Sequence, residues 1–327
     1  MSLREHSIYD CIINNALNSP EEIAIVSSDL RLTYRELTLQ VNSLARGMLN
    51  TGFEKGDRIG VLLNNCLEYA LLLAACTRIG LITVCLNTRT SADEMRKMLE
   101  QAKPKALIFQ KSYEQQADEL SELNIHQLYC IDEASVLSSS FEQLQDEDTS
   151  PLTESQPSVD EGWIIIPTAA VDGIPKGALL SQRNLMASAD VHHHHFGREA
   201  IKGHLLALPI FHVMGLTSAW ATFISGGKNV LLNQFDEKIA VNLIDSEDLT
   251  YFGSFPPVLE RVLDTAKESG SALESLKLVY GLEGVENINR LQEETNAVFW
   301  TGFGQAETTA FVTVSRASEC PGSSGRP

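Results

Sequence analysis

The chain has 327 residues, of which 43% are hydrophobic, so it is long enough for two compact domains or one large α/β unit. Its 43 acidic and 25 basic side chains give a net charge of −18, and the sequence holds no run of lysine or arginine, which argues against a broad surface for nucleic acids or anionic membranes. The six cysteines lie far apart without a Cys-x-x-Cys pair, which predicts reduced core thiols in a cytoplasmic protein rather than disulfides or structural zinc.

Helical and strand patterns alternate along the first part of the chain. The opening segment MSLREHSIYD is polar and lacks the apolar stretch of a signal peptide. Residues 31–52 then carry apolar side chains at helical spacing and end at Gly52, and residues 58–64 read as a short buried strand.

Residues 69–86 imitate a membrane span because they are almost wholly apolar. Arg78 lies in the middle of this segment and Gly80 follows it, which predicts a buried helix ending near Arg78, a turn, and a buried strand over residues 81–86. No transmembrane segment is therefore expected.

A second amphipathic helix is predicted over residues 92–101, and a strand over residues 105–109 follows Pro104. The order strand, helix, strand, helix, strand is typical of a parallel, doubly wound sheet.

A polar, acidic stretch over about residues 135–160 reads as a surface excursion or linker. It divides the chain into a first α/β subdomain, residues 1–160, and a second, residues 161–327. The second part again alternates, with strands predicted over residues 163–167, 204–210, 229–233, 276–280 and 297–304 and helices beginning at residue 185 and around residues 258–266 and 288–295.

The segment PTAAVDGIPKG, residues 167–177, follows a predicted strand with a loop that holds two glycines, a proline and a lysine. Such a loop can present backbone N–H groups, the hydroxyl of Thr168 and the cation of Lys176 to a polyphosphate. It lacks the Gly-Lys-Ser/Thr ending of a Walker A loop, so on local evidence a proline-containing surface turn remains the alternative.

Four consecutive histidines, residues 192–195, point around a helix and cannot converge on one metal ion, so no built metal site is predicted there. The sequence also has no Gly-x-Ser-x-Gly motif to support a serine hydrolase.

Two further segments follow the loop in a fixed order, ALPIFHVMGL at residues 207–216 and TGFGQAETT at residues 301–309. Together the three segments resemble the signature motifs of the adenylate-forming superfamily, and the opening of the chain is also similar to that family, so the resemblance covers nearly the whole sequence. The matching positions are Gly173, Pro175, Lys176, Gly177, Leu208, Pro209, Phe211, His212, Gly215, Phe303, Gly304 and Glu307.

The resemblance implies two doubly wound, mainly parallel sheets with flanking helices, an incomplete β-rich third subdomain, and a chain that stops before the family's C-terminal lid domain. It implies a reaction in which ATP and a carboxylic acid give an acyl-adenylate, which CoA then converts to a thioester. The partners would be these small molecules, with no nucleic acid, and a homodimer is compatible with the family.

The resemblance also assigns site residues, by their positions in the matching motifs. Thr168, Lys176 and Glu307 would be catalytic, and Glu307 would also hold Mg²⁺, a cation that favours carboxylate oxygen. Nucleotide would contact Gly173, Gly177, Gly302, Phe303, Gly304 and Gln305, and the acid would contact Phe211, His212 and Gly215. Without the motifs, the alternatives are a helix-capping role for Glu307 and a core packing role for Phe211 and His212.

His212 also bears on the substrate class. Family members that activate amino acids place an aspartate there to pair with the substrate ammonium, whereas an imidazole offers that charge no partner. A fatty or aryl acid is therefore preferred.

The sequence departs from the family in two places. Residues 169–172 are Ala-Ala-Val-Asp where the family has Ser-Gly-Thr-Thr, and residues 280–283 are Tyr-Gly-Leu-Glu on the adenine side. Two functions thus stay open: the N-terminal, substrate-binding part of an AMP-forming acyl-CoA synthetase, or a catalytically impaired acyl- or nucleotide-binding module with a degenerate phosphate loop.

Overall fold

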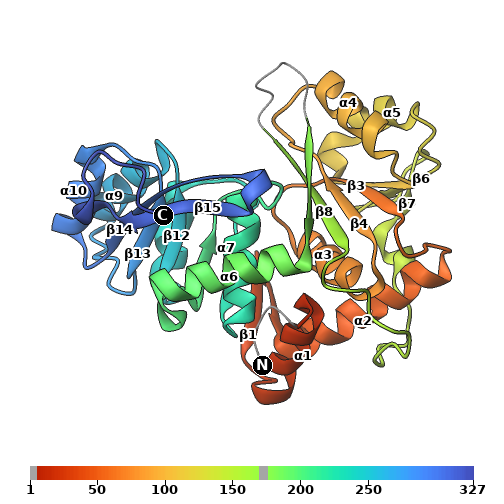
Figure 1. Ribbon diagram of the computed structural model, residues 1–327, viewed down its shortest axis with the longest axis horizontal. Coiled ribbons are helices and arrows are strands. Elements are labelled where there is room, and N and C mark those ends of the chain that lie inside the picture. The colour runs from red at the N-terminus through yellow and green to blue at the C-terminus, as the bar shows by residue number, and fades with distance from the viewer. Residues whose placement is uncertain (1–5, 169–175) are drawn as a thin grey trace. The chain divides into compact units, whose positions relative to one another are not determined.

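The computed structural model describes residues 6–168 and 176–327, which form two compact units. The first unit comprises Met1–Glu21 and Thr33–Leu185, and the second comprises Glu22–Leu32 and Met186–Pro327. Each described strand belongs to one of two sheets flanked by helices (Figure 1), so the predicted α/β class is confirmed.

The first unit contains a seven-stranded sheet in the order β7-β6-β5-β3-β4-β8-β9. Neighbouring strands are parallel, except that β8 and β9 form an antiparallel pair. The strands are β3 (Arg58–Leu62), β4 (Ile82–Cys85), β5 (Ala106–Phe109), β6 (Gln127–Cys130), β7 (Ser139–Ser140), β8 (Gly162–Pro167) and β9 (Gly177–Ser181).

Five helices accompany this sheet, and three of them begin with a reciprocal capping box in which a serine or threonine pairs with an acidic side chain three residues later. They are α1 (Ile8–Asn18), α2 (Tyr34–Asn50), α3 (Leu67–Ile79), α4 (Ala92–Ala102) and α5 (Glu114–Ser121), with short 3-10 turns η2 (Lys111–Tyr113) and η3 (Phe141–Leu144). Helices α4 and α5 bury their apolar stripes against β3, β4 and β5 in one core cluster.

The apolar segment 69–86 forms the predicted helix and strand, α3 and β4, with Gly80 in the left-handed region (φ 76°) between them. Arg78 is buried, and its guanidinium donates to the carbonyl oxygens of Leu152 and Glu154, both at 2.7 Å. In the described part of the chain, no helix is long and apolar enough to cross a membrane.

Of the two alternatives for the polar stretch 135–160, the structure favours a surface excursion over a linker, because the stretch belongs to the first unit. Its backbone carbonyls accept hydrogen bonds from side chains of α2: Ser43 Oγ donates to Asp146 and Arg46 donates to Asp148 and Ser150. The segment is therefore polar in composition but is held to α2 by hydrogen bonds to its backbone carbonyl oxygens.

The boundary between the units also differs from the one expected near residue 160. Strand β8 pairs with β4, so the segment after the polar stretch completes the first sheet. Strand β1 (Ile23–Ser27) pairs with β11 (Lys228–Leu231), which places an N-terminal hairpin in the second sheet.

The second unit contains an eight-stranded sheet in the order β15-β14-β13-β12-β10-β11-β1-β2. Its remaining strands are β2 (Leu30–Thr33), β10 (Gly203–Leu206), β12 (Tyr251–Ser254), β13 (Leu278–Gly281), β14 (Val298–Gln305) and β15 (Ala310–Arg316). Its helices are α6 (Gln182–Phe196), which begins in the first unit, α7 (Val213–Ile224), α8 (Glu237–Ser246), α9 (Val258–Ser269) and α10 (Val285–Glu294), with 3-10 turns η4 (Arg198–Ile201), η5 (Ala306–Thr308) and η6 (Ala317–Glu319).

Alternating side chains on the strands separate two layers of the second unit. Phe252 on β12 joins the core cluster formed with α8, α9 and α10, whereas its neighbour Tyr251 donates from Oη to the carbonyl oxygen of Ser218 on α7. The residues after β15 form η6 and one bridge between Val314 and Arg326, so the β-rich third subdomain is not a separate sheet among the described residues.

Candidate functional site

The phosphate-loop candidate lies on the β8–β9 hairpin of the first unit. Pro167 pairs with Gly177, and the N–H of Thr168 donates to the carbonyl oxygen of Lys176 at 2.8 Å. The hairpin therefore brings Thr168 and Lys176 side by side, with Thr168 half-buried and Lys176 exposed. Gly173 and the Ala-Ala-Val-Asp segment, residues 169–172, lie outside the described residues.

Gly177 has a packing role that the motif did not predict. A Cβ atom added there would overlap Cγ2 of Ile165, its diagonal neighbour on β8. Only the absence of a side chain lets β9 approach β8 at this point, so glycine is needed for the hairpin itself.

The other predicted site residues belong to the second unit, where β10, β12, β13 and β14 run parallel. Parallel strands end at one edge of a sheet, and ligands of α/β sheets bind at such edges. The segments that follow or end these strands are 207–212, 254–255, 281–283 and 301–305. Most of the predicted contacts to nucleotide and acid lie in these segments.

His212 is exposed and caps the N-terminus of α7. Its Nδ1 accepts a hydrogen bond from the N–H of Met214 at 3.3 Å, which assigns the ring proton of the neutral imidazole to Nε2. The ring stands edge-on to Phe255, 6.1 Å between centroids. His212 can therefore donate a hydrogen bond from Nε2 at a helix end where partial positive charge collects.

Phe211 and Gly215 are explained by packing. Phe211 is 5% exposed and belongs to the core. A Cβ atom on Gly215 would overlap the carbonyl oxygen of Pro209, so the turn from the motif into α7 requires glycine.

The segment TGFGQAETT forms the tip of the β14–β15 hairpin. Phe303 is 52% exposed, and a Cβ atom on Gly304 would overlap the carbonyl oxygen of Ala310, where the register of the two strands shifts. Ala310 itself has a left-handed backbone (φ 77°), which is strained for a residue with a side chain.

Glu307 is exposed on η5 at this tip, and Gln305 is the capping residue of that turn. Glu307 is the acidic residue in the first turn of η5, so the alternative of a carboxylate at a helix start stays open. Among the described residues, no three or more His, Cys, Asp or Glu side chains are grouped to hold a metal ion.

A polar network at the same edge was not predicted from the sequence. The Glu283 carboxylate accepts from Ser254 Oγ at 3.0 Å and from Asn287 Nδ2 at 3.3 Å. Gly281 is the register partner of Ser254 and has φ 141°, and a Cβ atom there would overlap the carbonyl oxygen of Ser254. The glycine in the altered adenine-side segment thus lets β13 end against β12.

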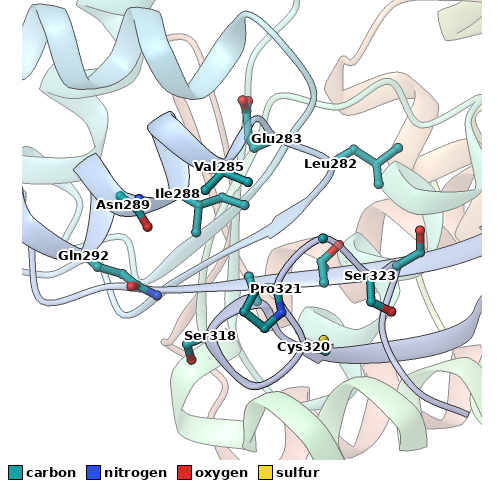
Figure 2. Close-up of a pocket in the computed structure, with 14 residues that line it drawn as sticks. Leu282, Glu283, Val285, Ile288, Asn289, Gln292, Ser318, Cys320, Pro321 and Ser323 are labelled. Atoms are coloured by element: carbon teal, nitrogen blue, oxygen red, sulfur yellow. The ribbon is translucent and has the colours of Figure 1, made fainter.

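A cavity of about 280 Å³ lies beside these residues in the second unit. Figure 2 shows side chains of α10 along one side of it and residues around Pro321 along the other. Glu283, Leu282 and Thr301 also line it, so the cavity adjoins the strand end that carries Gly302 and Phe303.

The histidine run points in different directions, as predicted. His192 is fully buried, and burial lowers its pKa to about 4. His193 bonds to Ser225 Oγ at 2.7 Å through Nε2, and His194 is exposed.

Comparisons with known proteins agree with this geometry. The model of the AMP-binding enzyme family matches residues 13–327. A 2-succinylbenzoate–CoA ligase of Bacillus pumilus (strain SAFR-032) is 27% identical over 320 residues, which are 97% of this chain and 63% of that protein. The chain thus spans less than two thirds of the length of this relative.

Two solved structures are similar. A protein of Rhodopseudomonas palustris CGA009, provisionally named a long-chain-fatty-acid CoA ligase, is 31% identical with a TM-score of 0.91, covering 100% of this chain and 82% of that chain. The o-succinylbenzoate CoA synthetase of Bacillus subtilis in complex with AMP shares the fold, with a TM-score of 0.82 at 22% identity, covering 97% and 80%. The extent of the family match decides the assignment: this chain belongs to the AMP-binding enzyme family.

Proposed function

We propose that this chain is the N-terminal, substrate-binding part of an AMP-forming acid–CoA ligase and that its acid is an aryl carboxylate. The observation that carries the proposal is the edge of the second sheet, where an exposed imidazole donor follows β10 and an exposed aromatic ring and an exposed carboxylate lie at the end of β14. The 2-succinylbenzoate–CoA ligase relative supports an aryl acid, whereas the Rhodopseudomonas palustris structure is named for a long-chain fatty acid, so both classes enter the test.

The reaction would proceed in two displacements. A carboxylate oxygen of the acid attacks the α-phosphorus of ATP, the bond from that phosphorus to the bridging oxygen breaks, and pyrophosphate leaves. The CoA sulfur then attacks the acyl carbonyl, loses its proton, and displaces AMP. Positioning and charge stabilisation contribute most to the first step, because negative charge is redistributed over phosphoryl oxygens.

His212 is assigned to the acid. Its Nε2–H would donate to the carboxylate oxygen that does not attack, and the N-terminus of α7 would favour the same negative charge. Both interactions orient the acid without requiring a change in the protonation of the imidazole.

Lys176 and Thr168 are assigned to phosphate oxygens, as a cation and a hydroxyl donor. Phe303 offers an exposed aromatic face to the adenine, with Gly302, Gly304 and Gln305 beside it and the cavity of about 280 Å³ next to them.

Glu307 fits Mg²⁺ in the way this ion is usually held with nucleotides. Mg²⁺ binds through one or two carboxylates plus substrate phosphates and water, and the exposed Glu307 supplies one such carboxylate. When bound, the ion neutralises charge on the phosphate oxygens.

ATP–pyrophosphate exchange with a panel of aryl and fatty acids tests the proposal. Lys176→Ala and Glu307→Gln should lower exchange at least tenfold. Lys202→Ala and Glu319→Gln are matched controls, since both side chains are exposed and form surface ion pairs, with Glu199 and Arg316. Exchange that survives both site variants would contradict these assignments.

The second candidate, an impaired binding module, rests on the Ala-Ala-Val-Asp sequence at residues 169–172. It predicts binding of MgATP or acid by calorimetry without exchange for any acid in the panel. Replacement of these four residues by Ser-Gly-Thr-Thr should then raise MgATP affinity at least tenfold, about 1.4 kcal/mol.

A further inference from the structure

In the part of the chain that the structure describes, the two sheets end in four edge strands, β7 and β9 in the first sheet and β2 and β15 in the second. An edge strand offers unpaired backbone N–H and C=O groups to any other strand, so folded proteins usually shorten, charge or cover their edges. An edge without such protection is a candidate interaction surface.

Three of these edges are protected. Strand β7 has only two residues. Strand β2 carries Arg31, which forms an ion pair with Glu247. Strand β15 is covered at Val314, whose N–H donates to the carbonyl oxygen of Arg326 at 2.9 Å. A further strand would have to displace or avoid these features.

Strand β9 lacks all three kinds of protection. Its five residues, GALLS, include no charged side chain and no proline, and β8 is its only strand partner among the described residues. Ala178 and Leu180 are buried, whereas Leu179, which alternates to the other face of the sheet, is 55% exposed. The edge is therefore open and carries an exposed apolar side chain.

The hydrogen bonds of the β8–β9 hairpin show which backbone groups of β9 point outward. The N–H of Thr168 donates to the carbonyl oxygen of Lys176, so these two opposed residues are a hydrogen-bonded pair. Hydrogen-bonded and non-hydrogen-bonded pairs alternate along an antiparallel ladder, and the register stays regular through Leu180. The N–H and C=O groups of Gly177 and Leu179 therefore point away from β8, toward any strand that lies beside β9.

A cavity of about 200 Å³ adjoins this edge. Ile82, Met98, Ile165 and Leu179 line it with apolar side chains, and Arg58 and Gln101 line it with polar ones. Gly177 also lines the cavity and adds no side chain, so two residues of the edge strand border it. A strand beside β9 would lie next to this cavity.

A second copy of this chain fits the edge. Antiparallel pairing of two β9 strands about Leu179 lets the two Leu179 residues exchange both N–H···O=C bonds and sets Gly177 opposite Ser181. The contact is isologous, so the same surface serves both copies and the pair closes. Residues 177–182 carry no charge, so no like charges lie directly opposite each other.

Charge at the ends of the strand is complementary in this register. Lys176 is exposed and precedes β9, so it lies beyond Ser181 of the other copy. At that end the exposed carboxylates of Asp160 and Glu161 directly precede the β8 residue that pairs with Ser181. Both carboxylates are already ion-paired within their own copy, so this contact sets the antiparallel direction more than it adds affinity.

We propose that β9 is a dimerisation edge, at which two copies of this chain pair their β9 strands antiparallel about Leu179 and join their first sheets into one. Leu179 of each copy then contacts Leu179 of the other beside the cavity, which removes two exposed apolar side chains from water. This inference does not depend on the ligase activity.

The dimer is expected to be weak. Two five-residue strands form a small contact compared with the about 1,000 Å² of a stable interface, and the N–H of Ser181 already donates to Asn184 Oδ1, which shortens the ladder. A net charge of −18 on each copy adds repulsion, which salt screens. Association should therefore strengthen as ionic strength rises.

Sedimentation velocity of the full chain at concentrations up to about 0.3 mM, in low and high salt, tests the inference. A reversible monomer–dimer equilibrium is expected, with more dimer in high salt. Leu179→Lys sets two cations opposite each other at the centre of the contact and should weaken association at least tenfold. Leu17→Lys is the matched control, because Leu17 is 75% exposed on α1 of the same unit, and it should leave association unchanged.

Amide hydrogen exchange of the natural sequence locates the contact without a variant. The Leu179 amide should exchange more slowly as protein concentration rises, because its outward N–H becomes bonded in the dimer. The Ala178 amide faces β8 and should not change with concentration. Thermal melting checks that both variants are folded.

A chain that stays monomeric over the whole concentration range would overturn the inference. A dimer that persists in Leu179→Lys, or that forms without slowing exchange at Leu179, would show that the copies meet at another surface. Protection of the Leu179 amide that is independent of concentration would also contradict pairing between copies, since another segment of the same chain would then cover the edge.

Discussion

The buried histidines of the second unit should make the protein sensitive to mild acid. Burial lowers the pKa of His192 from 6.5 to about 4 and that of His204 from 6.5 to about 3. Because the unfolded chain takes up these protons first as the pH falls, stability is fully present above pH 6.5 and is lost progressively toward the folded pKa values.

While the pH stays above both folded pKa values, the size of the effect follows from how far the pH lies below the ordinary histidine pKa of the unfolded chain. At pH 5.5, one unit below the ordinary value, each histidine should cost about 1.4 kcal/mol, and both together about 2.7 kcal/mol. Glu247 acts in a different range: hydrogen bonds from Arg31 and Lys228 lower its pKa to about 2, so its contribution is lost only below pH 4.5.

The test is His192→Phe, which replaces a neutral imidazole in a cluster of aromatic rings and removes one buried titrating group. Urea unfolding at pH 7.5 and 5.5, followed by tryptophan fluorescence, should show a loss of about 2.7 kcal/mol in the natural sequence and about half of that in the variant. Equal losses in the two proteins would show that His192 does not remain neutral in the folded state.

Three further predictions follow from single contacts. His212→Asp should keep α7 capped, since aspartate is a good N-cap, but should weaken benzoate binding by ~1 to 4 kcal/mol through repulsion at about 4 Å; calorimetry showing unchanged affinity would place the carboxylate elsewhere. Gly215→Ala should lower stability by ~1 to 3 kcal/mol because its methyl group overlaps the Pro209 carbonyl, and an unchanged melting temperature would contradict this packing. Arg78→Met should remove a charged donor from the carbonyls of Leu152 and Glu154 and cost ~3 kcal/mol, with faster hydrogen exchange at residues 152–154; unchanged exchange there would mean that other contacts hold the segment.

Local patterns predicted most elements of the first sheet. The strand at residues 58–64, the helix and strand within residues 69–86, and the helix at residues 92–101 correspond to β3, α3 with β4, and α4. These segments have a clear apolar period, or an apolar run with a glycine at its break, so neighbouring residues alone define them.

Elements without such a period were missed. Helix α7 is buried on nearly every side, so its sequence shows no polar face, and β12 is only four residues long. Strand β9 follows the phosphate-loop candidate directly, where a helix was expected to be the next element. These short or fully buried segments are fixed by the strands beside them rather than by their own pattern.

The sequence alone determined the family and the order of the motifs. Positions where two backbone segments approach closely require glycine, and the candidate site requires charged side chains, so both occur at fixed spacing in the sequence. Tertiary structure decided what each residue does: it placed Phe211 in the core, gave Gly177 and Gly215 packing roles, and left His212 exposed with a donor at Nε2. It also brought His192 and Tyr280 together across 88 residues. Side chains that far apart in the chain meet only when helix and strand pack, so no local pattern could have shown this contact.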